Sequence, residues 1–142
     1  MAHLEYLRAQ MTAQHRADQS IGNETPRSPK LATVAGVDLN VDPKTTLYTV
    51  PAGMSCIVTH VIIRLASANL TTANYGFGFD ANATDVIAAA THTELTGNTL
   101  YTVLYAKAGA KLGAATNVFG VKCATKQGGA STVTIDVYGR IF

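Results

Sequence analysis

The chain has 142 residues, of which 47% are hydrophobic and 14% charged, with a formal net charge of +2 and two cysteines. This length suits one domain with residues to spare, and the hydrophobic fraction excludes a wholly disordered chain. The small net charge does not favour nucleic-acid binding, no apolar run reaches the roughly 18 residues of a membrane span, and two cysteines cannot form a dense disulfide scaffold.

Charge is distributed unevenly along the chain. Residues 1–44 contain 5 acidic and 5 basic residues, whereas residues 45–142 contain only 4 acidic and 6 basic ones together with nine of the ten aromatic residues. A charge-poor surface carries little like-charge repulsion, as expected of a surface covered by neighbouring subunits, or of a Thr-rich β-protein that is simply neutral. The sequence therefore predicts an N-terminal arm over residues 1–44 and a compact body over residues 45–142.

The arm is expected to begin as a short helix and to continue as an extended connector. Apolar residues recur at helical spacing within residues 1–18, and Pro26 and Pro29 exclude a helix further on. Such a short helix is marginal in water, so the arm docks on a partner or remains a disordered tail. An alternating run over residues 37–41 indicates an edge strand. The candidate partner-binding residues of the arm are Leu4, Leu7, Met11, Val34, Val37, Leu39 and Val41.

The body alternates β-strand patterns with turn signals. Strands are expected at residues 46–50, 54–66, 100–106, 117–123 and 131–142, with turns at residues 51–53 and 126–130. Residues 85–90 fit either a strand or one helical turn. This pattern predicts an all-β sandwich or barrel of seven to eight strands, preceded by the N-terminal helical and extended arm. We favour a β-sandwich of two antiparallel sheets packed face to face with Greek-key connections.

Aromatic residues mark one face of several predicted strands. Residues 75, 77 and 79 are aromatic and alternate with Gly76, Gly78 and Asp80, so one strand has an aromatic face and a bare face that permits close backbone approach. We interpret the aromatic residues of the body as core and near-core packing, namely Tyr75, Phe77, Phe79, Tyr101, Tyr105 and Tyr138.

Residues that carry catalytic chemistry are scarce. No phosphate-binding loop is present, and Gly76 and Gly78 lack the third glycine of a dinucleotide fingerprint. Cys56 and His60 are four residues apart, which on a strand places them on one face but about 13 Å apart, too far for a nucleophile and its base. We therefore expect no catalytic residues, no cofactor and no enzymatic activity.

A metal site is the remaining chemical possibility. His92 and Glu94 can share one face of a strand, and Asp80 and Asp85 can lie nearby. A cupin-type barrel needs a further histidine pair and a glutamate at fixed spacing, which the sequence lacks. We expect no specific metal site, and the competing hypothesis of a metal-binding β-barrel predicts bound metal that is lost when His92 and Glu94 are replaced by alanine.

Two segments resemble small virion proteins of tailed bacteriophages. They are LYTVPAG at residues 47–53, which leads into a long β-branched strand ending at residue 64, and IDVYGRIF at residues 135–142. The resemblance covers residues 45–142 and is strongest to capsid decoration (cement) proteins, although the same turn also occurs in tail and fibre proteins.

The resemblance implies that the body is a jelly-roll-like β-sandwich of seven to eight antiparallel strands. It further implies a structural protein made in the host cytoplasm and seated on the outer capsid surface. Its implied partners are the major capsid protein and further copies of the chain in a homotrimer, with no nucleic acid and no membrane. The alternative is a fibre, spike or tail-associated module that binds a receptor or glycan, which predicts an exposed aromatic or polar pocket.

Overall fold

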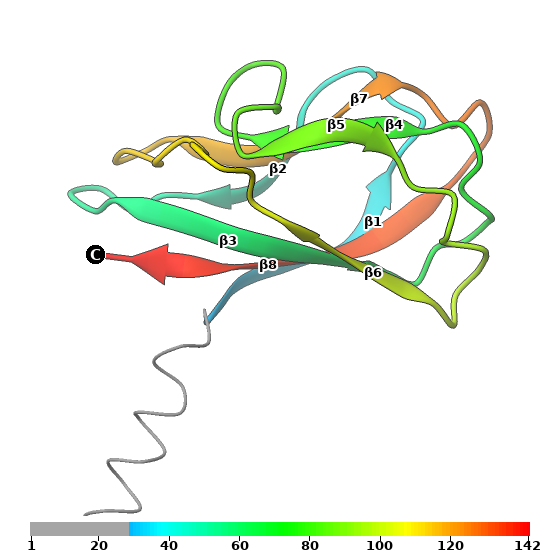
Figure 1. Ribbon diagram of the computed structural model, residues 1–142, viewed down its shortest axis with the longest axis horizontal. Helices are drawn as coiled ribbons and strands as arrows, with labels where there is room; N and C mark the ends of the chain where they lie inside the picture. The colour runs from blue at the N-terminus through cyan, green and yellow to red at the C-terminus, as the bar shows by residue number, and fades with distance from the viewer. Residues whose placement is uncertain (1–28) are drawn as a thin grey trace, which may run out of the picture.

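The computed structural model describes residues 29–142, which form two antiparallel β-sheets packed face to face (Figure 1). The eight strands are β1 (Lys30–Asp38), β2 (Thr45–Thr49), β3 (Cys56–Arg64), β4 (Asn74–Gly78), β5 (Ile87–Thr91), β6 (Tyr101–Tyr105), β7 (Val118–Thr125) and β8 (Thr132–Ile141). The predicted all-β sandwich is confirmed, and the segment that fitted either a strand or a helical turn contributes β5. The described residues include no helix long and apolar enough to cross a membrane.

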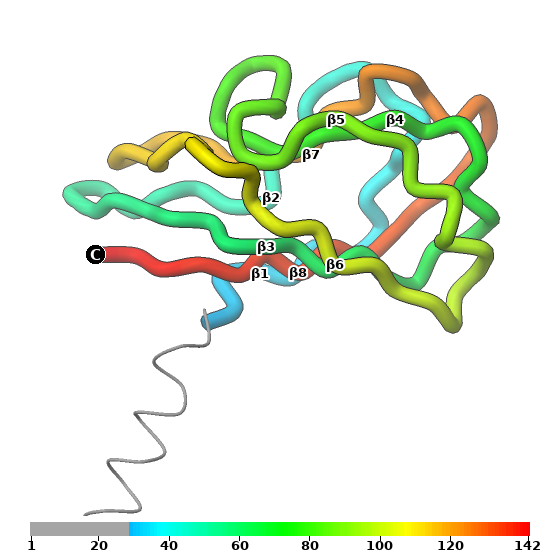
Figure 2. The backbone as a smooth tube through the Cα atoms, viewed as in Figure 1, coloured from blue at the N-terminus to red at the C-terminus, as the bar shows by residue number. Residues whose placement is uncertain are grey.

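Each sheet has four strands drawn from the whole length of the described chain. Sheet A has the order β1-β8-β3-β6 and sheet B has the order β2-β7-β4-β5, so most successive strands alternate between the sheets (Figure 2). This is the strand order of a jelly roll, in which two interleaved Greek keys fold over each other. Four strands therefore lie at sheet edges: β1 and β6 in sheet A, and β2 and β5 in sheet B.

The sandwich begins well before residue 45. Strand β1 pairs with β8 from Lys30↔Tyr138 to Asp38↔Thr132. The expected arm over residues 1–44 is therefore wrong for residues 30–44, because these residues pair with and pack against the same chain. The predicted edge strand at residues 37–41 lies earlier, at residues 30–38, and the helical part of the arm, residues 1–18, lies outside the described residues.

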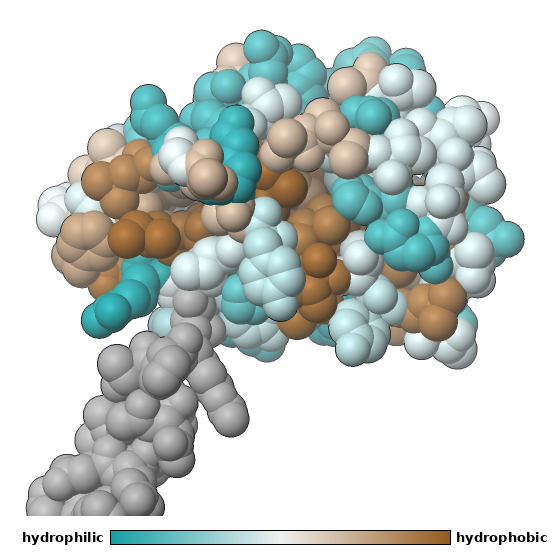
Figure 3. All heavy atoms as spheres, in the orientation of Figure 1, coloured by the Kyte–Doolittle hydropathy of each residue, from teal (hydrophilic) through white to brown (hydrophobic). Residues whose placement is uncertain are grey.

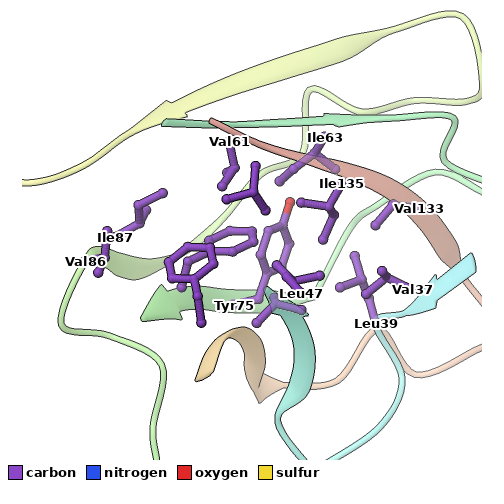
Figure 4. Close-up of a cluster of buried hydrophobic side chains, with 14 of the residues drawn as sticks. Val37, Leu39, Leu47, Val61, Ile63, Tyr75, Val86, Ile87, Val133 and Ile135 are labelled. Carbon is purple, nitrogen blue, oxygen red and sulfur yellow. The ribbon is translucent and has the colours of Figure 1, made fainter. Parts of the chain in front are cut away.

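The core lies between the two sheets and holds their period-two apolar faces. Sheet A contributes Val61, Ile63 and Ile135, and Tyr75 points toward them from sheet B (Figure 4). The rings of Tyr75 and Phe77 meet edge to face at 6.0 Å. The predicted aromatic face of this strand is confirmed as core, since both side chains are fully buried.

The bare face of the same strand is covered by backbone. A Cβ atom at Gly76 would lie 2.7 Å from the carbonyl oxygen of Ala83, and one at Gly78 would collide with the carboxylate of Asp85. Both contacts come from the connection between β4 and β5, which folds back over the outer face of sheet B. Glycine is needed at these positions for close backbone approach, as the sequence predicted.

Candidate interaction surfaces

The predicted partner-binding residues fall into three environments. Leu4, Leu7 and Met11 lie outside the described residues. Val37 and Leu39 are 2% and 0% exposed, so they belong to the core of this chain and cannot serve as docking groups.

The remaining two candidates, Val34 and Val41, are half-buried, and Val34 packs against the same core. The apolar residues of the predicted edge strand at residues 37–41 are therefore buried or half-buried within this chain. Val34 lies on β1, which adds to the sheet of its own chain rather than to a neighbour's sheet, and Val41 lies beyond the end of β1.

Cys56 and His60 lie on opposite faces of β3, not on one face as the spacing predicted. A β-bulge between Val58 and His60 shifts the register by one residue, which reverses the side-chain alternation. Cys56 is buried in the core, where desolvation raises the pKa of its thiol. His60 faces outward and stacks on Tyr138 with ring centroids 4.6 Å apart, and partial burial lowers the pKa of its imidazole.

His92 and Glu94 lie in the turn after β5 and contact each other. The Nδ1 atom of His92 is 3.2 Å from Oε1 of Glu94, which also accepts a hydrogen bond of 2.9 Å from the hydroxyl of Thr102. Burial alone raises the pKa of Glu94, but hydrogen bonds from its own backbone, from Thr102 and from His92 hold it below its ordinary value. The pair thus ties this turn to β6.

Asp80 and Asp85 accept hydrogen bonds within the connection over sheet B instead of joining His92. Asp80 accepts one from the backbone of Thr84 at 3.0 Å, and Asp85 one from the backbone of Phe79 at 2.7 Å. Across residues 29–142 no group of three or more histidine, cysteine or acidic side chains is arranged to hold a metal ion.

Lys44 fastens the same connection to sheet B. Its ammonium group donates to the backbone carbonyls of Phe79, Asp80 and Val118 at 3.2, 3.0 and 2.7 Å. Desolvation lowers the pKa of this lysine, while the nearby carboxylates of Asp80 and Asp85 act in the opposite direction.

Beside the connection, a shallow pocket of about 470 Å³ opens on the outer face of sheet B, lined by Asp42, Asn82, Thr84, Ala89, Lys122, Cys123 and Ala124.

The outer face of sheet A carries an exposed aromatic surface. Tyr101 and Tyr105, on edge strand β6, have 68% and 71% of their surface exposed. The interpretation of these two tyrosines as core packing is therefore wrong, because the alternation of β6 directs residues 101, 103 and 105 away from sheet B. Across the sheet, His60 lies between Tyr105 and Tyr138.

A charge pair lies in the middle of this outer face. Nε of Arg64 on β3 donates to Asp136 of β8 at 2.8 Å, and the hydroxyl of Thr33 on β1 donates to the same carboxylate at 2.7 Å. The hydrogen bond from Arg64 lowers the pKa of Asp136 below its ordinary value, because its effect exceeds that of burial, which raises the pKa. Between this pair and Tyr101 lies a pocket of about 390 Å³, whose other lining residues are Ile62, Leu65, Asn98, Thr99 and Leu100.

A second apolar surface lies at the end of the sandwich that holds the C-terminus. We call it the end patch and define it as Ile57, Leu112 and Phe142, which are between 43% and 59% exposed. Backbone hydrogen bonds join Ser55 to Phe142 in both directions, and a bridge joins Cys56 to Gly113. Figure 3 shows apolar surface at this end of the molecule, beside the C-terminus of Figure 1.

The end patch also collects the segments that carry the sequence resemblance. The turn after β2, with Pro51 and Gly53, precedes Ser55 and is exposed, while Leu47 and Val50 before it are buried. Residue 29 lies near this end as well, since its carbonyl accepts a hydrogen bond from Gly139 at 3.0 Å. Sequence reasoning missed this surface because its members are far apart in the chain.

Comparison with known proteins finds no family and only distant likeness among solved structures. No family model matches the chain, and no curated protein matches it. Among solved structures, the chain is similar to one described as "Cyanophage Pam1 capsid asymmetric unit", with a TM-score of 0.44 and 19% sequence identity over 78% of this chain and 81% of that chain. A likeness this distant does not assign the chain to a family.

Proposed function

We propose that the chain is a structural, non-enzymatic protein of a tailed-phage virion. In this role it acts as a capsid decoration protein that binds the major capsid protein on the outer shell and stabilises the particle. The observation that carries the proposal is the end patch, where apolar side chains of three separate segments are exposed together. Exposed apolar clusters on an otherwise polar surface are typical of protein–protein contact sites.

Two features of the sequence support this assignment. The LYTVPAG and IDVYGRIF segments, which resemble decoration proteins, both contribute to the end patch or its border. The body has only ten charged residues in 98, so a neighbouring protein can cover it with little cost of charge desolvation. In this proposal residues 1–28 reach the same capsid protein, because residue 29 lies close to the end patch.

The proposal is tested with capsids assembled from the major capsid protein. Leu112→Glu places a charge in the end patch and is expected to weaken capsid binding at least tenfold, the equivalent of about 1.4 kcal/mol. Leu100→Glu is the matched control, since Leu100 is exposed to a similar degree, 43% against 49%, but lies outside the end patch. Equal binding by both variants and the unaltered chain would refute the end patch as the contact.

The contribution of the N-terminal residues is tested separately. Deletion of residues 1–28 leaves β1 complete and is expected to reduce capsid binding and particle stability. Unchanged binding would remove the arm, with Leu4, Leu7 and Met11, from the proposal. The resemblance further implies a homotrimer, which the mass of the purified chain in solution tests.

A receptor- or glycan-binding module is the second candidate function. The pocket beside Tyr101 favours it, because an exposed aromatic ring next to Arg64, Asp136 and Asn98 offers both stacking and hydrogen bonds to a sugar. Glycan-array binding that is lost in Tyr101→Ala and retained in Leu112→Glu would favour this function over capsid decoration.

A further inference from the structure

The free edge of β6 differs from the other three sheet edges in its regularity. The pairings of β1, β2 and β5 with their neighbours each contain a register irregularity, and β1 also carries Lys30 and Asp38. Bulges and charges of this kind protect edge strands from pairing with other chains. Strand β6, with the sequence Tyr-Thr-Val-Leu-Tyr, pairs with β3 without a bulge and contains no charge, proline or glycine.

The backbone groups that β6 presents at its free edge follow from its pairing with β3. The N–H of Ala106 donates to the carbonyl of Thr59 at 2.8 Å, so residue 106 faces β3. Backbone direction alternates along an antiparallel strand, which directs residues 102 and 104 toward β3 and Tyr101, Val103 and Tyr105 toward the free edge. Within residues 29–142, the N–H and C=O groups of these three residues have no backbone partner across that edge.

We propose that β6 of one copy pairs antiparallel with β6 of a second copy, around a two-fold axis at Val103. In this register Val103 pairs with Val103 of the second copy, and Tyr101 pairs with Tyr105 of the second copy. These are the residues whose backbone groups face the free edge, so every such donor meets an acceptor. The two four-stranded A sheets become one continuous eight-stranded sheet.

The side chains support a second copy as the occupant because the strand is its own complement. The two-fold brings an exposed tyrosine opposite another at both ends, and aromatic cross-strand pairs are among the stabilising ones. Strand β6 itself carries no charge. On the outer face beside it, Arg64 and Asp136 already neutralise each other, while Glu94 contacts β6 through the hydroxyl of Thr102, whose side chain alternates to the other face. Tyrosine and arginine are the residue types enriched at protein interfaces.

The small size of the contact points to a weak complex. A tyrosine can bury on the order of 150–250 Å², so four tyrosines about 70% exposed supply on the order of 500 Å² of the ~1,200 Å² that stable interfaces need. We therefore expect self-association in the micromolar range. The contact is separate from the three-fold contact of the proposed homotrimer, and both contacts together would give six copies.

The experiment measures the mass of the full chain by sedimentation across about 1 to 200 μM, a range chosen around a micromolar Kd. We expect an even number of copies, halved in Val103→Lys, where two lysines would face each other on the axis. Ala88→Lys adds the same charge on edge strand β5 of the other sheet and is expected to leave the mass unchanged. Circular dichroism of both variants checks that the fold is retained.

A second measurement does not depend on tolerance of the lysine. In the paired register the Cα atoms of the two residues 103 would be about 5.5 Å apart, within disulfide range. Val103→Cys is expected to cross-link into a covalent dimer under mild oxidation, whereas Ala88→Cys is not, and the natural Cys56 and Cys123 are buried.

A monomer across the whole concentration range would overturn the proposal, as would an oligomer that Val103→Lys leaves intact. In the first case the edge is open to residues 1–28 or to a different protein, and in the second the copies meet elsewhere. Neither result bears on capsid binding, which Leu112→Glu tests independently.

Discussion

Replacement of Asp136 by asparagine tests whether the charge cluster on sheet A stabilises the fold. The Asp136 side chain is 7% exposed and accepts two short hydrogen bonds, from Arg64 at 2.8 Å and from Thr33 at 2.7 Å. A hydrogen bond to a charged group contributes about 1.5–3 kcal/mol. The Arg64 side chain is 39% exposed and is hydrated again when the pair is lost. The contribution of its hydrogen bond to stability therefore lies at the lower end of this range.

We expect Asp136→Asn to lower the free energy of unfolding by about 2 kcal/mol at pH 7, because asparagine keeps an acceptor for Thr33 but loses the charge. For a domain of this size that corresponds to a decrease in Tm of about 8 °C. The assay is equilibrium urea unfolding followed by circular dichroism, with Tm measured in parallel.

The pH dependence follows from the lowered pKa of Asp136. A carboxyl whose pKa is lower in the folded than in the unfolded chain stabilises the fold above the unfolded value, about 3.9 for aspartate. The difference between the unaltered chain and Asp136→Asn should shrink as the pH falls below that value. It should vanish once the folded carboxyl is also protonated.

Asp42→Asn provides the matched control. Asp42 also pairs with a cation, Lys126 at 3.3 Å, but its side chain is 79% exposed. We expect this substitution to change stability by less than about 0.5 kcal/mol. Equal effects of the two substitutions at pH 7, or a difference for Asp136→Asn that grows in acid, would refute the reasoning.

Three further substitutions test the packing of the sandwich by thermal and urea unfolding. Gly78→Ala should destabilise the fold by about 1–3 kcal/mol because its Cβ collides with Asp85, whereas Gly129→Ala, with nothing within 4 Å, should be nearly neutral; similar values would contradict this. Tyr75→Phe should leave stability unchanged or raise it, since the buried hydroxyl has no hydrogen-bond partner among the described residues; a loss above about 1 kcal/mol would reveal one, such as a buried water. Lys44→Met should cost about 2 kcal/mol and speed hydrogen exchange in residues 79–86, because three charge-assisted hydrogen bonds are removed; unchanged exchange would show that the lysine does not fasten this segment.

The residues of β3 show where sequence reasoning succeeded and where it failed. The β-branched run over residues 57–63 predicted a strand correctly, because strand formation follows from local side-chain pattern. The side-chain pattern of this run does not reveal the bulge between Val58 and His60. The bulge nevertheless places Cys56 in the core and His60 on the outer face of sheet A, beside the exposed tyrosines. A one-residue shift in register turns every following side chain to the opposite face of the sheet. Spacing alone therefore cannot show that two residues on either side of a bulge share a face.

The site residues show the same division. The strand expected at residues 100–106 is confirmed as β6, and Tyr101, Val103 and Tyr105 share its outward face. Whether that face is core or surface depends on which side of sheet A meets sheet B, a property of the packed sandwich. The end patch was beyond prediction for a similar reason, since Ile57, Leu112 and Phe142 meet only through long-range pairing.

The low charge of the body is a property of the sequence alone. It determined that the chain has a charge-poor β-rich part, and the strand periods determined the fold class, because burial of period-two faces requires a second sheet. The tertiary structure decided where that part begins, since residues 30–38 complete sheet A through pairing with β8, about a hundred residues away. The tertiary structure also decided which uncharged surfaces are exposed. Packing of the two sheets buries one apolar face of a strand and leaves the other exposed to a partner, and the sequence does not distinguish the two faces.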